Sequence, residues 1–202
     1  MFDLQKSQLV ITIVCAVIFV VLAVINPYFG SVNMMIRHYI AENRNLRWRA
    51  LMILTHRYND VLSLSVQTMV LAMLIAYVWN DLRRAMILMS AMFIQTTVVG
   101  LSKRLSSIAR PPQLLTHVIM KSSSYPSGHS AASMTFAFLV PIILWPFLPV
   151  ALTLIITAYL FLVALLTAYG RLYLDVHWLS DIVGGWLLSA MTILMSRMFL
   201  LG

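Results

Sequence analysis

Charged residues are scarce in this chain of 202 residues. Only 10% of the residues are charged, and 6 of them are acidic, whereas 61% are hydrophobic. A soluble domain of this length needs a more polar surface, so the composition excludes that class and indicates an integral membrane protein. The single cysteine, Cys15, excludes an intramolecular disulfide bond.

Signatures of metal and nucleic-acid binding are missing as well. The sequence has neither a cluster of carboxylates nor the Cys/His spacing of a metal site, so we expect no metal ion and no other cofactor. The net charge is +8, but no basic and aromatic patch lies on a polar module, and we expect no nucleic-acid partner. Anionic lipid or a phosphorylated substrate is the more natural partner for this charge.

Long apolar runs make up most of the sequence. A run of about 17 to 25 residues crosses a bilayer as a helix. The first run lacks the cleavage site of a signal peptide, so we interpret it as a retained span. The pattern predicts one all-α domain over residues 1–202, a membrane bundle with six transmembrane helices. The predicted spans are residues 9–25, 61–79, 85–101, 131–148, 151–169 and 182–201.

Residues 31–50 have a different pattern, which predicts an amphipathic helix in the membrane interface. Apolar side chains recur there at helical spacing on one face, while charged side chains fall largely elsewhere. An ordinary connecting helix between two spans fits the same pattern. The apolar positions are Val32, Met35, Ile36, Tyr39 and Ile40.

The order of the spans brings three polar segments to one membrane face. With six spans, the third ends where the fourth begins, and the fifth ends and the sixth begins on that same side. The polar segments at these places are residues 103–112, 121–130 and 170–181.

The first polar segment contains two cations, Lys103 and Arg110, seven positions apart. On a helix this is about 10 Å along the axis, with both side chains on one side. Pro111 pushes Arg110 out of helical geometry, so the helix is expected to end there. The two cations then converge on one anion, or they form a basic flank that anchors the third span.

The second segment reads KSSSYPSGHS. Pro126 suits the first turn of a helix, so Ser127, Gly128, His129 and Ser130 would offer free backbone N–H groups to a phosphate. Gly128 would also let an anion approach the backbone closely. The alternative is a capped start of the fourth span with an incidental histidine.

The third segment places Arg171 at the end of the fifth span and His177 and Asp181 at the start of the sixth. Residues four apart share a helix face. The carboxylate can therefore hold one imidazole nitrogen and direct the other outward. A purely structural pair at a membrane helix end is the alternative.

Together the three segments resemble the signature of the type 2 phosphatidic acid phosphatase family of membrane lipid phosphatases. That signature is Lys, six residues and Arg-Pro, then Pro-Ser-Gly-His, then Ser-Arg, five residues, His, three residues and Asp. All three spacings match, and the one departure is Gly170, where the family has serine. The resemblance implies a phosphatase that requires no metal.

The resemblance also implies a role for each matching residue. His177 would attack phosphorus and form a phosphohistidine, with Asp181 orienting it, and His129 would protonate the leaving oxygen. The phosphate oxygens would be held by Lys103, Arg110, Arg171, the Ser127 hydroxyl and the Gly128 N–H.

The implied substrate is a phosphorylated membrane lipid, such as undecaprenyl diphosphate, phosphatidylglycerol phosphate or phosphatidic acid. A lipid A phosphatase or phosphotransferase of the same family is an alternative, and a non-catalytic lipid-binding protein is another. Vanadium haloperoxidases share the signature, but the membrane composition argues against their chemistry. A membrane haem protein would draw its ligands from His38, His56, His117, His129 and His177.

The resemblance implies a bacterial inner (plasma) membrane protein whose site faces the extracytoplasmic side. The distribution of Lys and Arg favours the opposite orientation, with ten on the side of the motifs and four on the other. We follow the family here, because cations that serve phosphate or anionic lipid distort the count.

Overall fold

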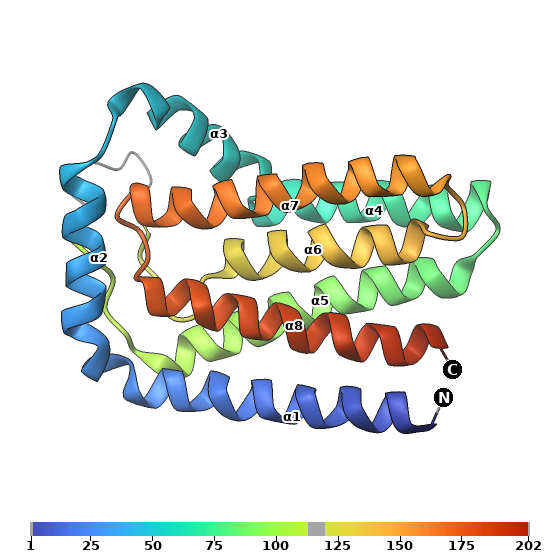
Figure 1. Cartoon of the computed structure of the whole chain (residues 1–202), viewed down its shortest axis with the longest axis horizontal. Coiled ribbons are helices and arrows are strands. Elements are labelled where there is room, and N and C mark those ends of the chain that lie inside the picture. Colours follow the sequence, from blue (N-terminus) through green and yellow to red (C-terminus); the bar gives the residue numbers. More distant parts are fainter. Residues whose placement is uncertain (1, 113–119, 202) are drawn as a thin grey trace.

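The chain forms a bundle of antiparallel helices, shown in Figure 1 by a computed structural model that describes residues 2–112 and 120–201. Within this described part, five helices are long and apolar enough to cross a membrane, and no strand occurs. They are α1 (Phe2–Ile25), α4 (Val61–Val78), α5 (Leu82–Ser106), α7 (Val150–Tyr173) and α8 (Leu179–Leu201).

The sixth long helix, α6 (Gly128–Leu144), runs through the middle of the bundle. It has 17 residues and packs against α5, α7 and α8, and most of its side chains are buried. The predicted membrane bundle of six helices is confirmed, with the fourth helix beginning three residues before the predicted span. This earlier start arises because the Ser127 side chain caps the helix by accepting from the Ser130 N–H.

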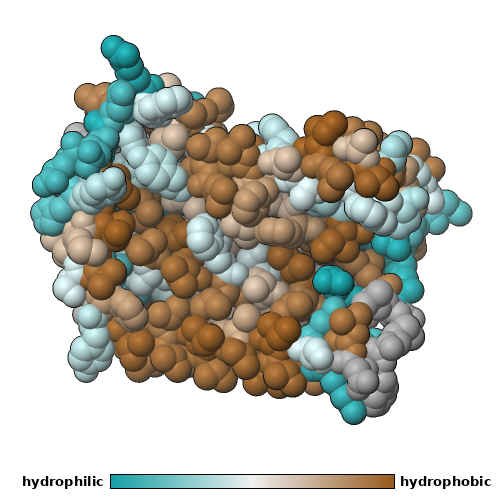
Figure 2. Space-filling view, in the orientation of Figure 1, coloured by the Kyte–Doolittle hydropathy of each residue, from teal (hydrophilic) through white to brown (hydrophobic). Residues whose placement is uncertain are grey.

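The outside of the bundle is apolar, as a lipid environment requires. Large hydrophobic side chains on α1, α4, α5 and α7 are exposed rather than packed inside. Figure 2 shows hydrophobic side chains over the length of the bundle and hydrophilic ones gathered toward its two ends. The buried apolar core lies instead between α4, α5, α6 and α7, where Ile75, Leu88, Leu139 and Ile143 are fully enclosed.

Both predicted junctions lie at the same end of the bundle, as the order of the spans requires. The end of α5, the start of α6, the end of α7 and the start of α8 lie together on the left of Figure 1. The chain termini lie at the opposite end. The three polar segments are therefore brought to one face of the molecule.

The stretch 31–50 forms three short elements rather than one helix. Helix α2 (Gly30–Glu42) crosses the ends of the long helices, followed by η2 (Leu46–Trp48) and α3 (Arg49–Tyr58). Ile40 of the predicted apolar face is buried against the bundle, whereas Met35 and Tyr39 are exposed. The apolar side chains that α2 exposes at the end of a membrane bundle are suited to the lipid interface.

A buried charge cluster fastens α2 to the loop between α7 and α8. The Asp175 carboxylate accepts from Arg37 Nε at 3.2 Å and from Arg44 Nη2 at 2.8 Å, and Asp175 is only 3% exposed. Arg44 also lies over the ring of Tyr173, whose hydroxyl donates to the Asn45 carbonyl oxygen. Since the same loop carries His177, this cluster holds the position of the third polar segment.

We predict that Asp175→Asn destabilises the protein in detergent by about 3 kcal/mol, a drop in the thermal unfolding midpoint on the order of 5 to 10 °C. The physical reason is that one nearly buried guanidinium group, Arg44, and one partly buried one, Arg37, lose their counterion. Glu42→Gln, at an exposed position on α2, is the matched control and should leave the midpoint unchanged. Equal midpoints for the two variants would show that the cluster contributes no stability.

Candidate active site

The imidazole of His177 is held by the Asp181 carboxylate. His177 lies two residues before α8 rather than on it, so the prediction of a shared helix face was wrong. The contact nevertheless forms, with Nδ1 of His177 at 3.2 Å from Oδ2 of Asp181 and both side chains almost fully buried. The chain folds back just before α8, which lets residues four apart meet without a helical turn between them.

Asp181 is in turn fixed by its own partners. Its Oδ2 accepts from the Trp178 backbone N–H at 2.8 Å and from the Ser124 hydroxyl. Its backbone carbonyl accepts from the Ser127 N–H at 3.0 Å. Ser124 was not among the predicted site residues. The sequence alone could not distinguish it from the neighbouring serines of the segment, because only the fold decides which hydroxyl faces the carboxylate.

Two glycines on α8 allow the second polar segment to lie against that helix. A Cβ atom at Gly184 would lie 2.3 Å from the Tyr125 ring, and one at Gly185 would lie 2.7 Å from the Ser127 carbonyl oxygen. Both distances are too short for any side chain to be accommodated without displacement. The Gly-Gly pair is therefore a sequence signal of this close packing, which brings Ser124 within reach of Asp181.

The other ring nitrogen of His177 faces Arg110. Arg110 Nη1 lies 3.3 Å from His177 Nε2. An arginine can only donate, so Nε2 is the acceptor and Nδ1 carries the proton toward Asp181. Burial first, and then the positive charges of Arg171 and Arg110, lower the pKa of His177 well below its ordinary value. His177 is therefore a neutral imidazole with an available lone pair on Nε2.

Lys103 and Arg110 do converge, but not along one helix. Helix α5 ends at Ser106, where Ser107 adopts a left-handed conformation with φ 47°. The expectation that the helix continues to Arg110 was therefore wrong. Arg110 reaches the site from the following non-helical segment, while Lys103 Nζ donates to the Ser123 carbonyl oxygen at 2.9 Å. Arg110 Nη2 bonds the same oxygen at 3.2 Å, so the two cations share a carbonyl.

Arg171 brings the third cation into the interior. It lies within the last turn of α7 and is fully buried. Its Nη1 is 2.7 Å from His56 Nδ1, whereas its Nε and Nη2 have no hydrogen-bond partner. Buried donors without a partner cost free energy, so the two open N–H groups are suited to an anion that enters the site.

Helix α6 begins at Gly128 with Ser127 as its N-cap, so the prediction that Pro126 lies in the first turn was wrong. The Ser130 N–H, predicted to be free, donates to the Ser127 side chain. The Ser127 hydroxyl lies 2.9 Å from the Ser130 hydroxyl, and its backbone N–H donates to Asp181. Both groups of Ser127 are thus engaged in the fold. The following N–H groups, of Gly128 and His129, are the first of α6 and lie at its positive dipole end.

His129 has two neighbours that the motifs did not indicate. Its Nε2 lies 3.5 Å from Asp60 Oδ1, and its ring stacks on that of His56 with centroids 4.6 Å apart. The contact with His129 lowers the pKa of Asp60 to about 2, so that this carboxylate is ionised at physiological pH. One signal was available: Asp60 is one of 6 acidic residues and directly precedes a span that starts on the motif side.

Gly170, the departure from the family signature, faces away from these groups. A Cβ atom there would lie 3.4 Å from Met52 Sδ and 3.4 Å from Thr55 Oγ1 of α3. A side chain at this position would therefore pack between α7 and α3.

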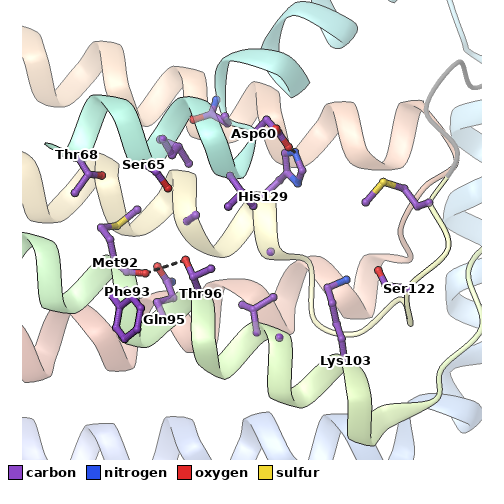
Figure 3. A pocket seen from close by; sticks show the side chains of 18 of the residues that line it. Asp60, Ser65, Thr68, Met92, Phe93, Gln95, Thr96, Lys103, Ser122 and His129 are labelled. Atoms are coloured by element: carbon purple, nitrogen blue, oxygen red, sulfur yellow. Dashed lines mark hydrogen bonds and ion pairs between the residues drawn. The ribbon is translucent and has the colours of Figure 1, made fainter. Parts of the chain in front are cut away.

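A cavity of about 460 Å³ runs from these groups toward the middle of the membrane-spanning helices. At the site end it is lined by Lys103, His129 and His177, and at the inner end by Thr68 and Gln95. Figure 3 shows the cavity between α4, α5 and α6, with Asp60 and His129 at one end and Thr68 and Met92 at the other. Its walls are mainly apolar, so it joins a charged centre to a hydrophobic channel.

Of the five histidines proposed as haem ligands, His56, His129 and His177 lie in the site described above. His38 is exposed on α2, and His117 lies outside the described residues. Among the residues that the structure describes, no group of three or more His, Cys, Asp or Glu side chains is placed to hold a metal ion.

Comparison with solved structures shows the same fold in two other proteins. The PAP2-type phosphatidylglycerolphosphate phosphatase from Bacillus subtilis is similar with a TM-score of 0.75 and 21% identity, covering 93% of this chain and 94% of the other. LpxE from Aquifex aeolicus is similar with a TM-score of 0.64 and 22% identity, covering 83% of this chain and 95% of the other. At these identities the likeness concerns the fold.

No curated protein sequence matches the chain. The sequence does match the PAP2 superfamily over residues 84–200, which is more than half of its length. That range contains all three polar segments, which the bundle assembles around His177. The protein therefore belongs to the PAP2 superfamily.

Proposed function

We propose that the protein is a metal-independent phosphatase that hydrolyses a phosphate monoester or diphosphate of a membrane lipid. The observation that carries the proposal is the buried, neutral His177, held through Nδ1 by Asp181 with Nε2 beside Arg110. This is the arrangement of an activated nucleophile with an orienting carboxylate. It lies at the end of a cavity that leads into the apolar part of the bundle.

The phosphate would be held by cations and N–H groups around His177. The open Nε and Nη2 of Arg171 offer two donors, and the start of α6 offers the backbone N–H groups of Gly128 and His129. Lys103 and Arg110 donate only to backbone or serine oxygens and to His177 in this structure, and can exchange some of these bonds for phosphate oxygens. Three positive charges neutralise the phosphate in the role that a metal ion has in other phosphatases.

The reaction then proceeds in two steps. Nε2 of His177 attacks phosphorus, a P–N bond forms, and the P–O bond to the lipid breaks while His129 gives a proton to the leaving oxygen. The Asp181 carboxylate stabilises the positive charge that His177 acquires. In the second step His129 takes a proton from water, whose oxygen attacks phosphorus and releases His177 and inorganic phosphate.

Asp60 gives His129 the support that a proton donor needs. A carboxylate 3.5 Å from Nε2 stabilises the protonated imidazole. Without Asp60, protonated His129 would be buried beside the positive charge of Arg171 with no carboxylate to balance it. We infer that Asp60 belongs to the site as a positioning and charge-balancing residue.

The cavity is suited to the lipid chain. Its position between α4 and α5 places an apolar channel beside the charged centre, so that a lipid can keep its chain among hydrophobic side chains while its phosphate meets His177. We infer a lipid phosphate as substrate on this basis. The phosphatidylglycerolphosphate phosphatase named above supports this class of substrate.

We further propose that the site faces the extracytoplasmic side of the inner membrane. The count of ten basic residues against four falls to seven against four without Lys103, Arg110 and Arg171. Three further arginines are neutralised by ion pairs: Arg37 and Arg44 with Asp175, and Arg84 with Asp81. Without them the count falls to five on the motif side against three on the other. The positive-inside bias then becomes small.

The chemistry predicts that His177→Ala lowers kcat/KM more than about a thousandfold, or ~4 kcal/mol, since no other group can replace the nucleophile. Incubation with a lipid phosphate labelled with ³²P should leave an alkali-stable, acid-labile label on the wild-type chain and none on the variant. His38→Ala, at an exposed position on α2, is the control and should be labelled normally.

Activity of His177→Ala within about tenfold of wild type would overturn the mechanism. Absence of phosphate release from every lipid phosphate by the wild type would favour a non-catalytic lipid-binding protein.

Blocking the cavity should affect lipid substrates selectively. A Cβ atom at Gly100, which lines the cavity, has no neighbour within 4 Å, so a side chain can start there, and we expect Gly100→Phe to place a ring in the cavity. We expect kcat/KM for a long-chain lipid phosphate to fall at least about tenfold, or ~1.4 kcal/mol, with little change for p-nitrophenyl phosphate. Leu101→Phe, at a neighbouring exposed position, should change neither. Equal losses on both substrates would exclude the cavity as the chain site.

Orientation can be measured directly. In a Cys15→Ser background, a cysteine placed at the exposed Arg47 should react with a membrane-impermeant thiol reagent added to intact cells. A cysteine at Arg83, which is exposed at the opposite end of the bundle, should react only after the membrane is opened. The reverse pattern would place the site in the cytoplasm.

A further inference from the structure

His56 reaches the phosphate site from α3, outside the three motif segments. Its Nδ1 lies 2.7 Å from Nη1 of Arg171, and its ring stacks on His129 with centroids 4.6 Å apart and planes inclined by 29°. One side chain therefore contacts both the innermost cation of the site and the histidine assigned as proton donor.

The contact with Arg171 determines the protonation state of His56. A guanidinium group can only donate, so Nδ1 must accept and the ring must be neutral. Burial first, and then the positive charge of Arg171, lower the pKa of His56 to about 4, with Arg57 acting in the same direction and Asp60 opposing it. His129, which stacks on the ring, is the other titratable group in contact with it. His56 is therefore uncharged throughout the physiological pH range.

Because the acceptor for Arg171 is the neutral ring of His56 rather than a carboxylate, Arg171 keeps its full positive charge. Among the described residues, no carboxylate forms an ion pair with Arg171. The hydrogen bond from Nη1 fixes the orientation of the guanidinium group, and Nε and Nη2 stay open. Because His56 brings no negative charge, the full positive charge of Arg171 remains for an entering phosphate.

We propose that His56 is a positioning residue of the phosphate site, which orients Arg171 through Nδ1 and His129 through ring stacking without reducing the positive charge. This inference rests on the proposed phosphatase function and adds to it a residue from a fourth segment of the chain. It also explains why α3 packs against the end of α7, since Arg171 lies in the last turn of that helix.

Three substitutions separate the features of His56. His56→Asn retains an acceptor near the position of Nδ1 but removes the ring. His56→Phe retains the ring and the stacking but removes the acceptor. His56→Asp retains an acceptor and adds a negative charge beside Arg171. His38→Asn, at an exposed position on α2, is the matched control for loss of a histidine.

The readouts are the affinity for inorganic vanadate, measured by calorimetry, and kcat and KM for p-nitrophenyl phosphate. Thermal unfolding of each variant in detergent is followed in parallel. We expect vanadate affinity within about threefold of wild type for His56→Asn and at least about tenfold weaker, or ~1.4 kcal/mol, for His56→Phe. His56→Asp should bind vanadate most weakly, because the carboxylate neutralises Arg171. In His56→Asn the loss should fall mainly on kcat, since the ring that holds His129 is gone.

The order of the vanadate affinities among the variants distinguishes a positioning role of His56 from a merely structural one. Vanadate affinities that follow the unfolding midpoints instead of this order would overturn the proposal, as would wild-type affinity in His56→Asp. If His56→Phe does not fold, the comparison of His56→Asn with His56→Asp still decides the role of charge. Because vanadate binding does not depend on turnover, failure of the phosphatase reaction would leave this ranking measurable and is a separate result.

Discussion

The hydrogen bond between His177 and Asp181 is the contact on which the rest of the site depends. It fixes the tautomer of the imidazole and leaves Nε2 available beside Arg110. To hold this bond in place, Asp181 needs the Ser124 hydroxyl and the Trp178 N–H. The Ser124 bond in turn depends on the close packing of its segment on α8 that Gly184 and Gly185 permit. A single orienting bond therefore explains the small residues and the serine-rich segment around it.

The second constraint is the balance of charge in a buried place. Three cations lie around His177, and the carboxylates near them are few and specifically assigned. Asp181 contacts His177, Asp60 contacts His129, and Asp175 is occupied with two arginines outside the centre. Arg171 instead contacts a neutral imidazole. Such an arrangement is costly when empty and favourable once an anion enters, because buried donors without partners then acquire them.

The membrane explains the remaining architecture. The end of α5, the start of α6, the end of α7 and the start of α8 lie at one end of the bundle, so the polar groups around His177 lie away from its apolar middle. The cavity between α4 and α5 extends from there into the apolar part of the bundle. The proposed lipid phosphatase reaction would need both environments within the length of one molecule, and six antiparallel spans with their polar residues at one end provide them.

The sequence by itself determined the class, the spans and the meeting of three motif segments at one face, because hydrophobic length and the alternation of antiparallel helices follow from local composition. The spacing also predicted that His177, Asp181 and the three cations lie at the same end of the bundle. Only the tertiary structure decided that Arg110 arrives from a non-helical segment and that Ser124 binds Asp181. It alone placed His56 and Asp60 beside Arg171 and His129. Those contacts join residues far apart in the chain. Their geometry depends on how the helices pack, which cannot be predicted from a local sequence pattern.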